Sequence, residues 1–118
     1  MKANPEALKE LVTAAFAGAG CGPDEARAIG DHLVEANLAG HDSHGVIRTP
    51  IYLEWMRDGK VVAGRDLEIV TDTGSLVVAD GQLGYGQWTG LQAVDLGVER
   101  ARAHGVALVA LRNCSNAS

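Results

Sequence analysis

The amino-acid sequence of 118 residues predicts an α+β fold: N-terminal helices followed by a β-hairpin, a helix and a buried strand. Three patterns lead to this prediction. Apolar residues recur at helical spacing in the first half of the chain and again over residues 87–103. Two short β-branched runs flank an Asp-Thr-Gly turn, and a continuous apolar run follows the last helix. Because a strand that is apolar on both faces needs covering on both, the elements predict the opening part of a larger mixed sheet.

The first two helices are expected before residue 40. Asn4 can cap the first helix, Pro5 fits its first turn, and the helix ends in the region of residues 18–22. Its apolar residues are Leu8, Leu11, Val12, Ala15 and Phe16. Pro23 opens the second helix, and Gly40 ends it. The apolar face of this second helix consists of Ala26, Ile29, Leu33 and Val34.

A third helix is expected from about Gly45 to Asp58. Ser43 can act as its N-cap, and Gly59 is its expected C-terminal stop. The residues expected to form its buried stripe are Ile47, Ile51 and Trp55.

The second half of the chain is expected to hold a hairpin, a helix and a strand. The β-branched runs are residues 67–71 and 76–80, and residues 72–74 form the turn between them. The helix is expected over residues 87–103, with one apolar side made of Leu91, Val94, Val98 and Ala101. Residues 106–111 are an unbroken apolar run, which is typical of a strand covered on both faces.

Charge and hydropathy argue against two classes of partner. Fifteen acidic and ten basic side chains give a net charge of -5, the wrong sign for binding nucleic acid. The longest apolar stretch is far shorter than the roughly 18 to 20 residues that span a bilayer, and no basic-then-apolar leader opens the sequence. We therefore expect no nucleic-acid partner, no membrane partner and a cytoplasmic location. In that compartment Cys21 and Cys114 are expected to be free thiols.

The densest cluster of reactive side chains lies in residues 40–52. On the expected helix, His44, Arg48 and Tyr52 are spaced i, i+4 and i+8, which places them on one stripe. The fork of donors on Arg48 suits the carboxylate of a small organic acid, and the helix start adds unpaired amides. His44 can give or take a proton near neutral pH at a carbonyl or hydroxyl beside that carboxylate. Tyr52 and Ser43 would orient the substrate by hydrogen bonding.

Each of these residues also has a structural interpretation. Ser43 can be a helix cap alone, and Arg48 and Tyr52 are of types that often form surface ion pairs and packing contacts on helices. His41 is expected to be structural. No metal site is expected, because no third ligand accompanies His41 and His44.

A glycine-rich stretch, residues 84–90, follows the second strand of the hairpin and opens the next helix, as a dinucleotide-binding fingerprint would. Thr89 stands where the third glycine of that fingerprint belongs, so the match fails. Gly81, Gly84 and Gly86 are therefore expected to be turn residues that allow a positive φ.

Four motifs occur in order along almost the whole chain. They are Gly40-His41-Asp42-Ser43-His44-Gly45-Val46 with Arg48 and Tyr52, Asp80-Gly81 before Gly84 and Gly86, Ala103-His104-Gly105-Val106, and Arg112-Asn113. Together they resemble the opening third of the malate/L-lactate dehydrogenase family. This is the NAD(P)-dependent group that lacks a Rossmann fold and includes ureidoglycolate dehydrogenase and diketogulonate reductase.

The resemblance implies the opening part of a larger mixed-sheet oxidoreductase fold. It also implies hydride transfer between NAD or NADP and the C2 carbon of a small 2-oxo or 2-hydroxy acid, in a homo-oligomer that is a homodimer in the family. His44 matches the family's proton donor to the carbonyl oxygen, and Ser43, Arg48 and Tyr52 match its substrate-side residues.

Two departures from the family pattern shape what we expect of this chain. Family members are much longer and bind the cofactor mostly through later loops, so no cofactor residue is assigned. Asn116 and Ser118 stand where the family has a second active-site His and a Gly. Residues 1–62 are then an N-terminal helical segment with substrate-side residues, and residues 63–118 are the truncated start of the α/β cofactor-side domain.

On its own, the chain is expected to be inactive. With its last strand uncovered, it is also expected to associate with itself or with a partner. The alternative is a non-catalytic dimerisation or interaction module left by truncation of such an enzyme.

Overall fold

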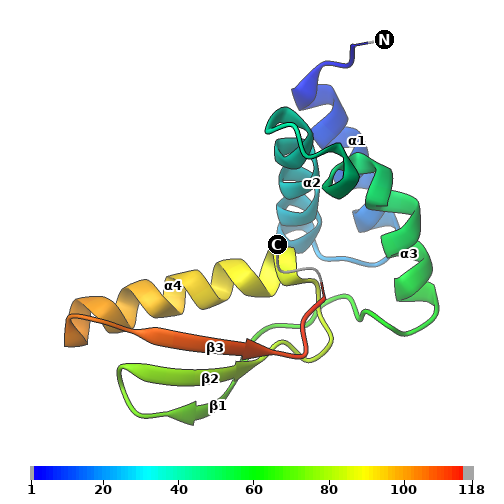
Figure 1. Ribbon diagram of the computed structural model, residues 1–118. Helices are drawn as coiled ribbons and strands as arrows, with labels where there is room; N and C mark the ends of the chain where they lie inside the picture. Colours follow the sequence, from blue (N-terminus) through cyan, green and yellow to red (C-terminus); the bar gives the residue numbers. More distant parts are fainter. Residues whose placement is uncertain (1, 116–118) are drawn as a thin grey trace. The chain divides into compact units, whose positions relative to one another are not determined.

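The computed structural model describes residues 2–115, and the chain divides into two compact units, residues 1–64 and 65–118 (Figure 1). The first unit contains the helices α1 (Pro5–Gly18), α2 (Pro23–Leu38) and α3 (Thr49–Arg57), with two 3-10 turns, η1 (Asp42–His44) and η2 (Val46–Arg48). The second contains the strands β1 (Glu68–Asp72), β2 (Leu76–Asp80) and β3 (Leu108–Arg112) and the helix α4 (Gly86–His104). No helix within residues 2–115 is long and apolar enough to cross a membrane. The predicted α+β fold class is confirmed.

Helices α1 and α2 pack together in the first unit and begin where the sequence predicts. Asn4 caps α1, because its Oδ1 accepts hydrogen bonds from the amides of Glu6 and Ala7 at 2.9 and 3.2 Å. The predicted apolar face of α2 is buried throughout. On α1 the buried residues are Val12 and Phe16.

The expected third helix is wrong at its N-terminal end. The α-helix begins at Thr49 rather than near Gly45, and the two 3-10 turns precede it. Pro50 explains the late start, because it fits the first turn of a helix that begins at Thr49. In a helix beginning at Gly45, its ring would instead clash with the carbonyl of Val46. Ser43 is therefore not the N-cap of this helix.

The buried side of α3 also differs from the predicted stripe. Tyr52 is the buried residue of this helix, whereas Ile47 and Ile51 are exposed. Ile47 belongs to η2, so the helical spacing that links it to the later residues does not exist. The predicted C-terminal stop is confirmed, since Gly59 follows the helix with a φ of +77°.

The second unit is a three-stranded mixed sheet in the order β1-β2-β3. Strands β1 and β2 form the predicted antiparallel hairpin, and β3 pairs parallel to β2. Helix α4 connects β2 to β3 and packs against β3 (Figure 1). At Gly97 of this helix, a Cβ would lie 3.5 Å from Cγ2 of Val109. Val77 and Ala79 of the central strand are fully buried.

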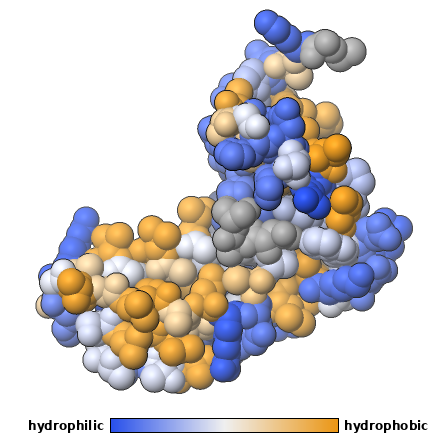
Figure 2. All heavy atoms as spheres, viewed as in Figure 1, coloured by the Kyte–Doolittle hydropathy of each residue, from blue (hydrophilic) through white to orange (hydrophobic). Residues whose placement is uncertain are grey.

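The opposite face of the sheet is open in this chain. Leu76 and Leu108, which pair in register, are 39% and 59% exposed. The last strand is found near its predicted place, but the prediction that it is buried on both faces is wrong. None of its residues is buried, Val109 and Leu111 are half-buried on one face, and the strand forms an edge of the sheet. The predicted apolar side of α4 is also exposed at Leu91, Val94 and Val98. Apolar side chains accordingly gather on the surface of this unit (Figure 2).

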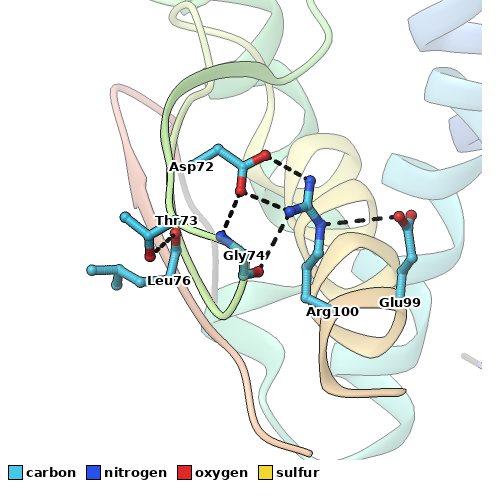
Figure 3. Close-up of polar contacts among 6 residues, drawn as sticks. All are labelled: Asp72, Thr73, Gly74, Leu76, Glu99 and Arg100. Carbon is cyan, nitrogen blue, oxygen red and sulfur yellow. Dashed lines mark hydrogen bonds and ion pairs between the residues drawn. The ribbon is translucent and has the colours of Figure 1, made fainter. Parts of the chain in front are cut away.

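One arginine fastens α4 to the hairpin turn (Figure 3). Nη1 and Nη2 of Arg100 donate to the two carboxylate oxygens of Asp72 at 2.7 and 2.8 Å. The same carboxylate accepts the amide of Gly74 at 2.9 Å and so holds the turn. The Arg100 side chain first, and the Gly74 amide second, lower the pKa of Asp72. The turn and the helix are therefore joined through an ionised carboxylate.

Candidate functional site

The segment of residues 41–48 follows the C-terminal end of α2 and carries three of the four predicted site residues. Gly40 turns the chain with a φ of +85°. The amide of His41 then donates to the carbonyl of Ala36 at 2.8 Å, which closes the helix end. In η1 the amide of His44 donates to the carbonyl of His41 at 2.9 Å. Local backbone hydrogen bonds thus shape the segment that presents the imidazole.

Ser43, His44 and Arg48 lie together on this segment. Ser43 Oγ is 3.0 Å from Nδ1 of His44, so Nε2 is the ring nitrogen that can face a substrate. Nε of Arg48 donates to the carbonyl oxygen of Ser43 at 2.7 Å. Within residues 2–115 no hydrogen bond occupies Nη1 or Nη2 of Arg48, which leaves a pair of donors for an anion. Ser43 and His44 are exposed, so a small molecule can reach them in this chain.

Tyr52 lies in the packed interior of the first unit. It is 4% exposed, and its ring centroid is 5.7 Å from that of Trp55 in a stacked contact and 6.5 Å from that of Phe16. The prediction that His44, Arg48 and Tyr52 share one stripe of a single helix is wrong, because they belong to η1, η2 and α3. The substrate-binding role of Tyr52 stays a prediction.

Asn37, in the last turn of α2, is a residue of this site that the sequence analysis missed. Its Nδ2 donates to Oδ1 of Asp42 at 2.8 Å, and its Oδ1 accepts the amide of Val46 at 2.8 Å. The two partners flank Ser43 and His44 in the sequence. Such side-chain contacts produce no periodic pattern in the sequence. Asn is also common near helix ends, so its position alone does not mark it as a site residue.

The glycine-rich loop after β2 packs against other parts of its own unit. A Cβ on Gly81 would lie 2.9 Å from the Cβ of Cys114, and one on Gly84 would lie 3.0 Å from the carbonyl oxygen of Gly81. The prediction that these glycines take a positive φ is wrong, since Gln82 and Leu83 do so, at 54° and 64°. Glycine is needed at Gly81 and Gly84 because other protein atoms approach them closely. Across residues 2–115, no group of three His, Cys, Asp or Glu side chains is placed to hold a metal ion.

A carboxylate ties this loop to the segment that follows β3. Asp80 accepts hydrogen bonds from the amide of Gln82 at 2.7 Å, Nδ2 of Asn113 at 2.9 Å and Nε of Arg112 at 3.0 Å. These bonds lower the pKa of Asp80, the Gln82 amide contributing most. The motif Arg112-Asn113 is therefore held against the loop. The departures from the family pattern expected at positions 116–118 lie outside the described residues.

Comparison with known proteins identifies relatives along nearly the whole chain. A profile of the family described as malate/L-lactate dehydrogenase matches residues 3–118. Hydroxycarboxylate dehydrogenase B of Escherichia coli O157:H7 is 39% identical over 108 residues, which are 92% of this chain and 30% of that protein. L-sulfolactate dehydrogenase of Methanocaldococcus jannaschii is 34% identical over 112 residues, which are 95% of this chain and 33% of that protein.

Solved structures agree with the fold. The sulfolactate dehydrogenase from Methanocaldococcus jannaschii superposes with a TM-score of 0.95 at 33% identity. The superposed region covers 100% of this chain and 34% of the chain of that enzyme. The malate dehydrogenase from Pyrococcus horikoshii OT3 superposes with a TM-score of 0.95 at 25% identity, over 100% of this chain and 34% of its own. The chain thus spans about a third of the length of the curated relatives it matches. With the family profile matched over residues 3–118, the chain belongs to the malate/L-lactate dehydrogenase family.

Proposed function

We propose that this chain is the N-terminal, substrate-side part of an oxidoreductase that transfers a hydride between NAD or NADP and a small 2-hydroxy or 2-oxo acid. The observation that carries the proposal is the grouping of Ser43, His44 and Arg48 on one short segment, where Ser43 and His44 are exposed and Arg48 is half-buried. Membership of a dehydrogenase family supports the reaction class. Its relatives are named as dehydrogenases of hydroxycarboxylates, sulfolactate and malate, which supports the substrate class.

Each residue of the group has a defined task in this proposal. Arg48 binds the substrate carboxylate through its Nη atoms, because its Nε is already held by the carbonyl of Ser43. His44 gives a proton from Nε2 to the carbonyl oxygen during reduction and takes it from the hydroxyl during oxidation. Ser43 fixes the ring orientation through its contact with Nδ1. Tyr52 is the remaining substrate-side residue, a role it takes from the family motif.

The nicotinamide cofactor, when bound, supplies or accepts the hydride. No described residue of this chain is assigned to hold it, since the glycines of the loop after β2 pack against protein atoms. In the proposed arrangement residues 1–62 carry the substrate-side groups, and residues 63–118 begin the cofactor-side domain. The complete protein is expected to act as a homo-oligomer.

A second candidate function rests on a separate observation. The open face of the sheet and the exposed side of α4 leave apolar surface on the second unit. This surface favours a non-catalytic dimerisation or interaction module. The two candidates differ in one respect that can be measured, which is whether His44 contributes to turnover.

The test replaces the matching N-terminal third of Escherichia coli hydroxycarboxylate dehydrogenase B with this chain and measures NADH and NADPH oxidation with a panel of 2-oxo acids. We expect turnover, and we expect His44→Ala to lower kcat about 100- to 10,000-fold. The matched control is His41→Ala, because the ring centroid of His41 lies 6.4 Å from that of His44. This control should keep most of the turnover. Unchanged turnover in His44→Ala would end the catalytic assignment.

Two further measurements extend this test. Arg48→Lys in the same hybrid enzyme should raise KM for the acid, because a lysine cannot reproduce the two parallel donors of the guanidinium. The chain alone should show no turnover and no quenching of nicotinamide fluorescence. An inactive hybrid would favour the interaction module, whereas association of the chain alone is expected under both candidates.

A further inference from the structure

We propose that Asn37 is a positioning residue, which clamps the segment carrying Ser43 and His44 by holding it on both sides. The inference deepens the proposed function and rests on it for the role of His44 in proton transfer. The clamp itself is a property of the chain and can be measured without turnover.

The two hydrogen bonds of the Asn37 amide enclose the reactive pair. On the N-terminal side, Nδ2 of Asn37 donates to the carboxylate of Asp42 at 2.8 Å. On the C-terminal side, Oδ1 of Asn37 accepts the amide of Val46 at 2.8 Å. One side chain thereby fixes both ends of the stretch of chain that contains Ser43 and His44.

The clamp stands on a rigid support. Asn37 projects from α2, whose residues Ile29, Leu33 and Val34 are 0%, 0% and 1% exposed. The segment it holds consists of short 3-10 turns with exposed side chains, which are weakly stabilised by themselves. A side chain that projects from a helix with a buried face can therefore set the position of an exposed imidazole.

Gly45 provides a separate geometric observation. A Cβ built on Gly45 would collide with Oδ1, Cγ and Nδ2 of Asn37. The segment therefore lies directly on the amide group, and the residue after His44 has no room for a side chain. The φ of Gly45 is -93°, so this glycine is required by contact rather than by backbone conformation.

Opposite the carboxylate of Asp42, the clamp needs an amide at position 37. An amide is both donor and acceptor, and each function is used here. A carboxylate at this position would lose the donor and would face the carboxylate of Asp42. An alanine would leave both Asp42 and the amide of Val46 without this partner.

The first test uses the 118-residue chain and two NMR readouts, which are hydrogen exchange of the Val46 amide and the ring signals of His44. Asn37→Ala should raise the exchange rate of Val46 roughly tenfold, the effect of losing one hydrogen bond. It should also shift or broaden the ring signals of His44. The control is Glu35→Gln, on the same helix, which removes the negative charge from the 2.8 Å contact with Nζ of Lys9. This control should leave both readouts unchanged.

A charge-exchange pair distinguishes positioning from a general loss of stability. Asn37→Asp should disturb both readouts, whereas Asp42→Asn keeps an acceptor at position 42 and should change them little. The double variant N37D/D42N restores the hydrogen bond with donor and acceptor exchanged. We expect it to return Val46 exchange to within roughly twofold of the parent chain. Failure of this rescue would overturn the clamp, as would unchanged readouts in Asn37→Ala.

The same variants in the hybrid enzyme link the clamp to turnover. Asn37→Ala should lower kcat roughly tenfold with little change in KM, and N37D/D42N should recover it. If Val46 exchange responds but kcat does not, the positioning role is overturned. A His44→Ala variant with unchanged turnover would refute the proposed function alone, because the exchange measurements do not depend on catalysis.

Discussion

Gly30 on α2 lies directly against α1. A Cβ at Gly30 would collide with Oγ1 of Thr13 and would lie 3.2 Å from both the carbonyl oxygen of Lys9 and the amide nitrogen of Thr13. Thr13 is β-branched and stiff, and the other two atoms belong to the backbone of α1, so the contact cannot relax cheaply. This glycine sets how closely the two helices pack.

We therefore expect Gly30→Ala to destabilise the first unit. Alanine gains about 1 kcal/mol in helix propensity, but overpacking costs typically about 1–3 kcal/mol and outweighs that gain. The measurement is the free energy of unfolding from urea denaturation followed by circular dichroism. Gly18→Ala is the control, because nothing lies within 4 Å of a Cβ at that position. Equal stability of the two variants would contradict the packing argument.

Residue-level prediction succeeds where the signal is local. The Asn4 cap and the buried Ile29 follow from residue type and spacing, and the structure confirms both. Asn37 and Tyr52 show the limit. The two bonds of Asn37 depend on the path of the chain after the helix, and the burial of Tyr52 depends on the contact with Phe16 from a distant segment. Neither contact repeats at a helical period, so the spacing of residues in the sequence does not predict it.

At the level of elements, the third helix shows how helical spacing in the sequence can assign residues to a helix that does not contain them. The spacing of His44, Arg48 and Tyr52 fits a helix, yet the α-helix begins only at Thr49. The side-chain bond from Asn37 and the ring of Pro50 together favour two 3-10 turns before it. The hairpin and α4 were predictable to within about a residue, because turn chemistry and helical periodicity both act locally there.

The contact between Asp72 and Arg100 predicts an acid-sensitive link between the hairpin turn and α4. Asp72 has a lowered pKa in the folded state, so its contribution to stability is complete above the unfolded pKa of about 4. That contribution is lost as pH falls through the lower folded value. Arg100→Gln should therefore destabilise the second unit at pH 6, and its deficit relative to the parent should shrink toward pH 2.

Urea denaturation at several pH values measures this deficit. Glu99→Gln is the control, since Oε1 of Glu99 lies 3.9 Å from Nε of Arg100 and its side chain is 75% exposed. It should change stability little at any of these pH values. A deficit in Arg100→Gln that stays constant from pH 6 to pH 2 would refute the charge-based link.

Two glycines, one inside α4 and one directly after its C-terminal end, have opposite expected responses to alanine. A Cβ on Gly97 would meet Val109 at 3.5 Å, an ordinary contact, so Gly97→Ala should stabilise the second unit by about 0.5–1 kcal/mol through helix propensity. Gly105 ends the helix with a φ of +88°, which an L-residue rarely adopts. Gly105→Ala should cost about 1–2 kcal/mol. Thermal unfolding of both variants checks the signs, and a stabilised Gly105→Ala would contradict the cap.

For the whole molecule, the sequence predicts the order of elements better than their exposure. A hairpin, a helix and an apolar strand were expected in that order, and the parallel pairing of β3 with β2 follows from the helical connection between them. Which apolar faces find cover inside the chain could not be predicted. An apolar stripe on a helix or strand indicates that this stripe is buried in the native protein. It does not indicate which other surface covers the stripe.

The uncovered faces of the second unit lead to a prediction about association. Strand β3 is an edge strand with Leu108 exposed beside Leu76, and α4 exposes a further apolar side. An open sheet edge next to exposed apolar side chains is a known template for contact with another chain. We therefore expect the chain to sediment as a species larger than a monomer and to bind a dye specific for apolar surface.

A charge placed on the open sheet face should weaken that association. Leu108→Lys introduces an ammonium at a side chain that is 59% exposed, so the fold loses little packing while a contact across this face must now desolvate a charge. Leu11→Lys is the matched control, since Leu11 is 68% exposed on a helix of the other unit. Sedimentation velocity at several concentrations should show a shift toward monomer for Leu108→Lys and the parent distribution for Leu11→Lys. A parent chain that remains monomeric and binds no dye would contradict the prediction, and equal effects of the two lysines would locate the contact elsewhere.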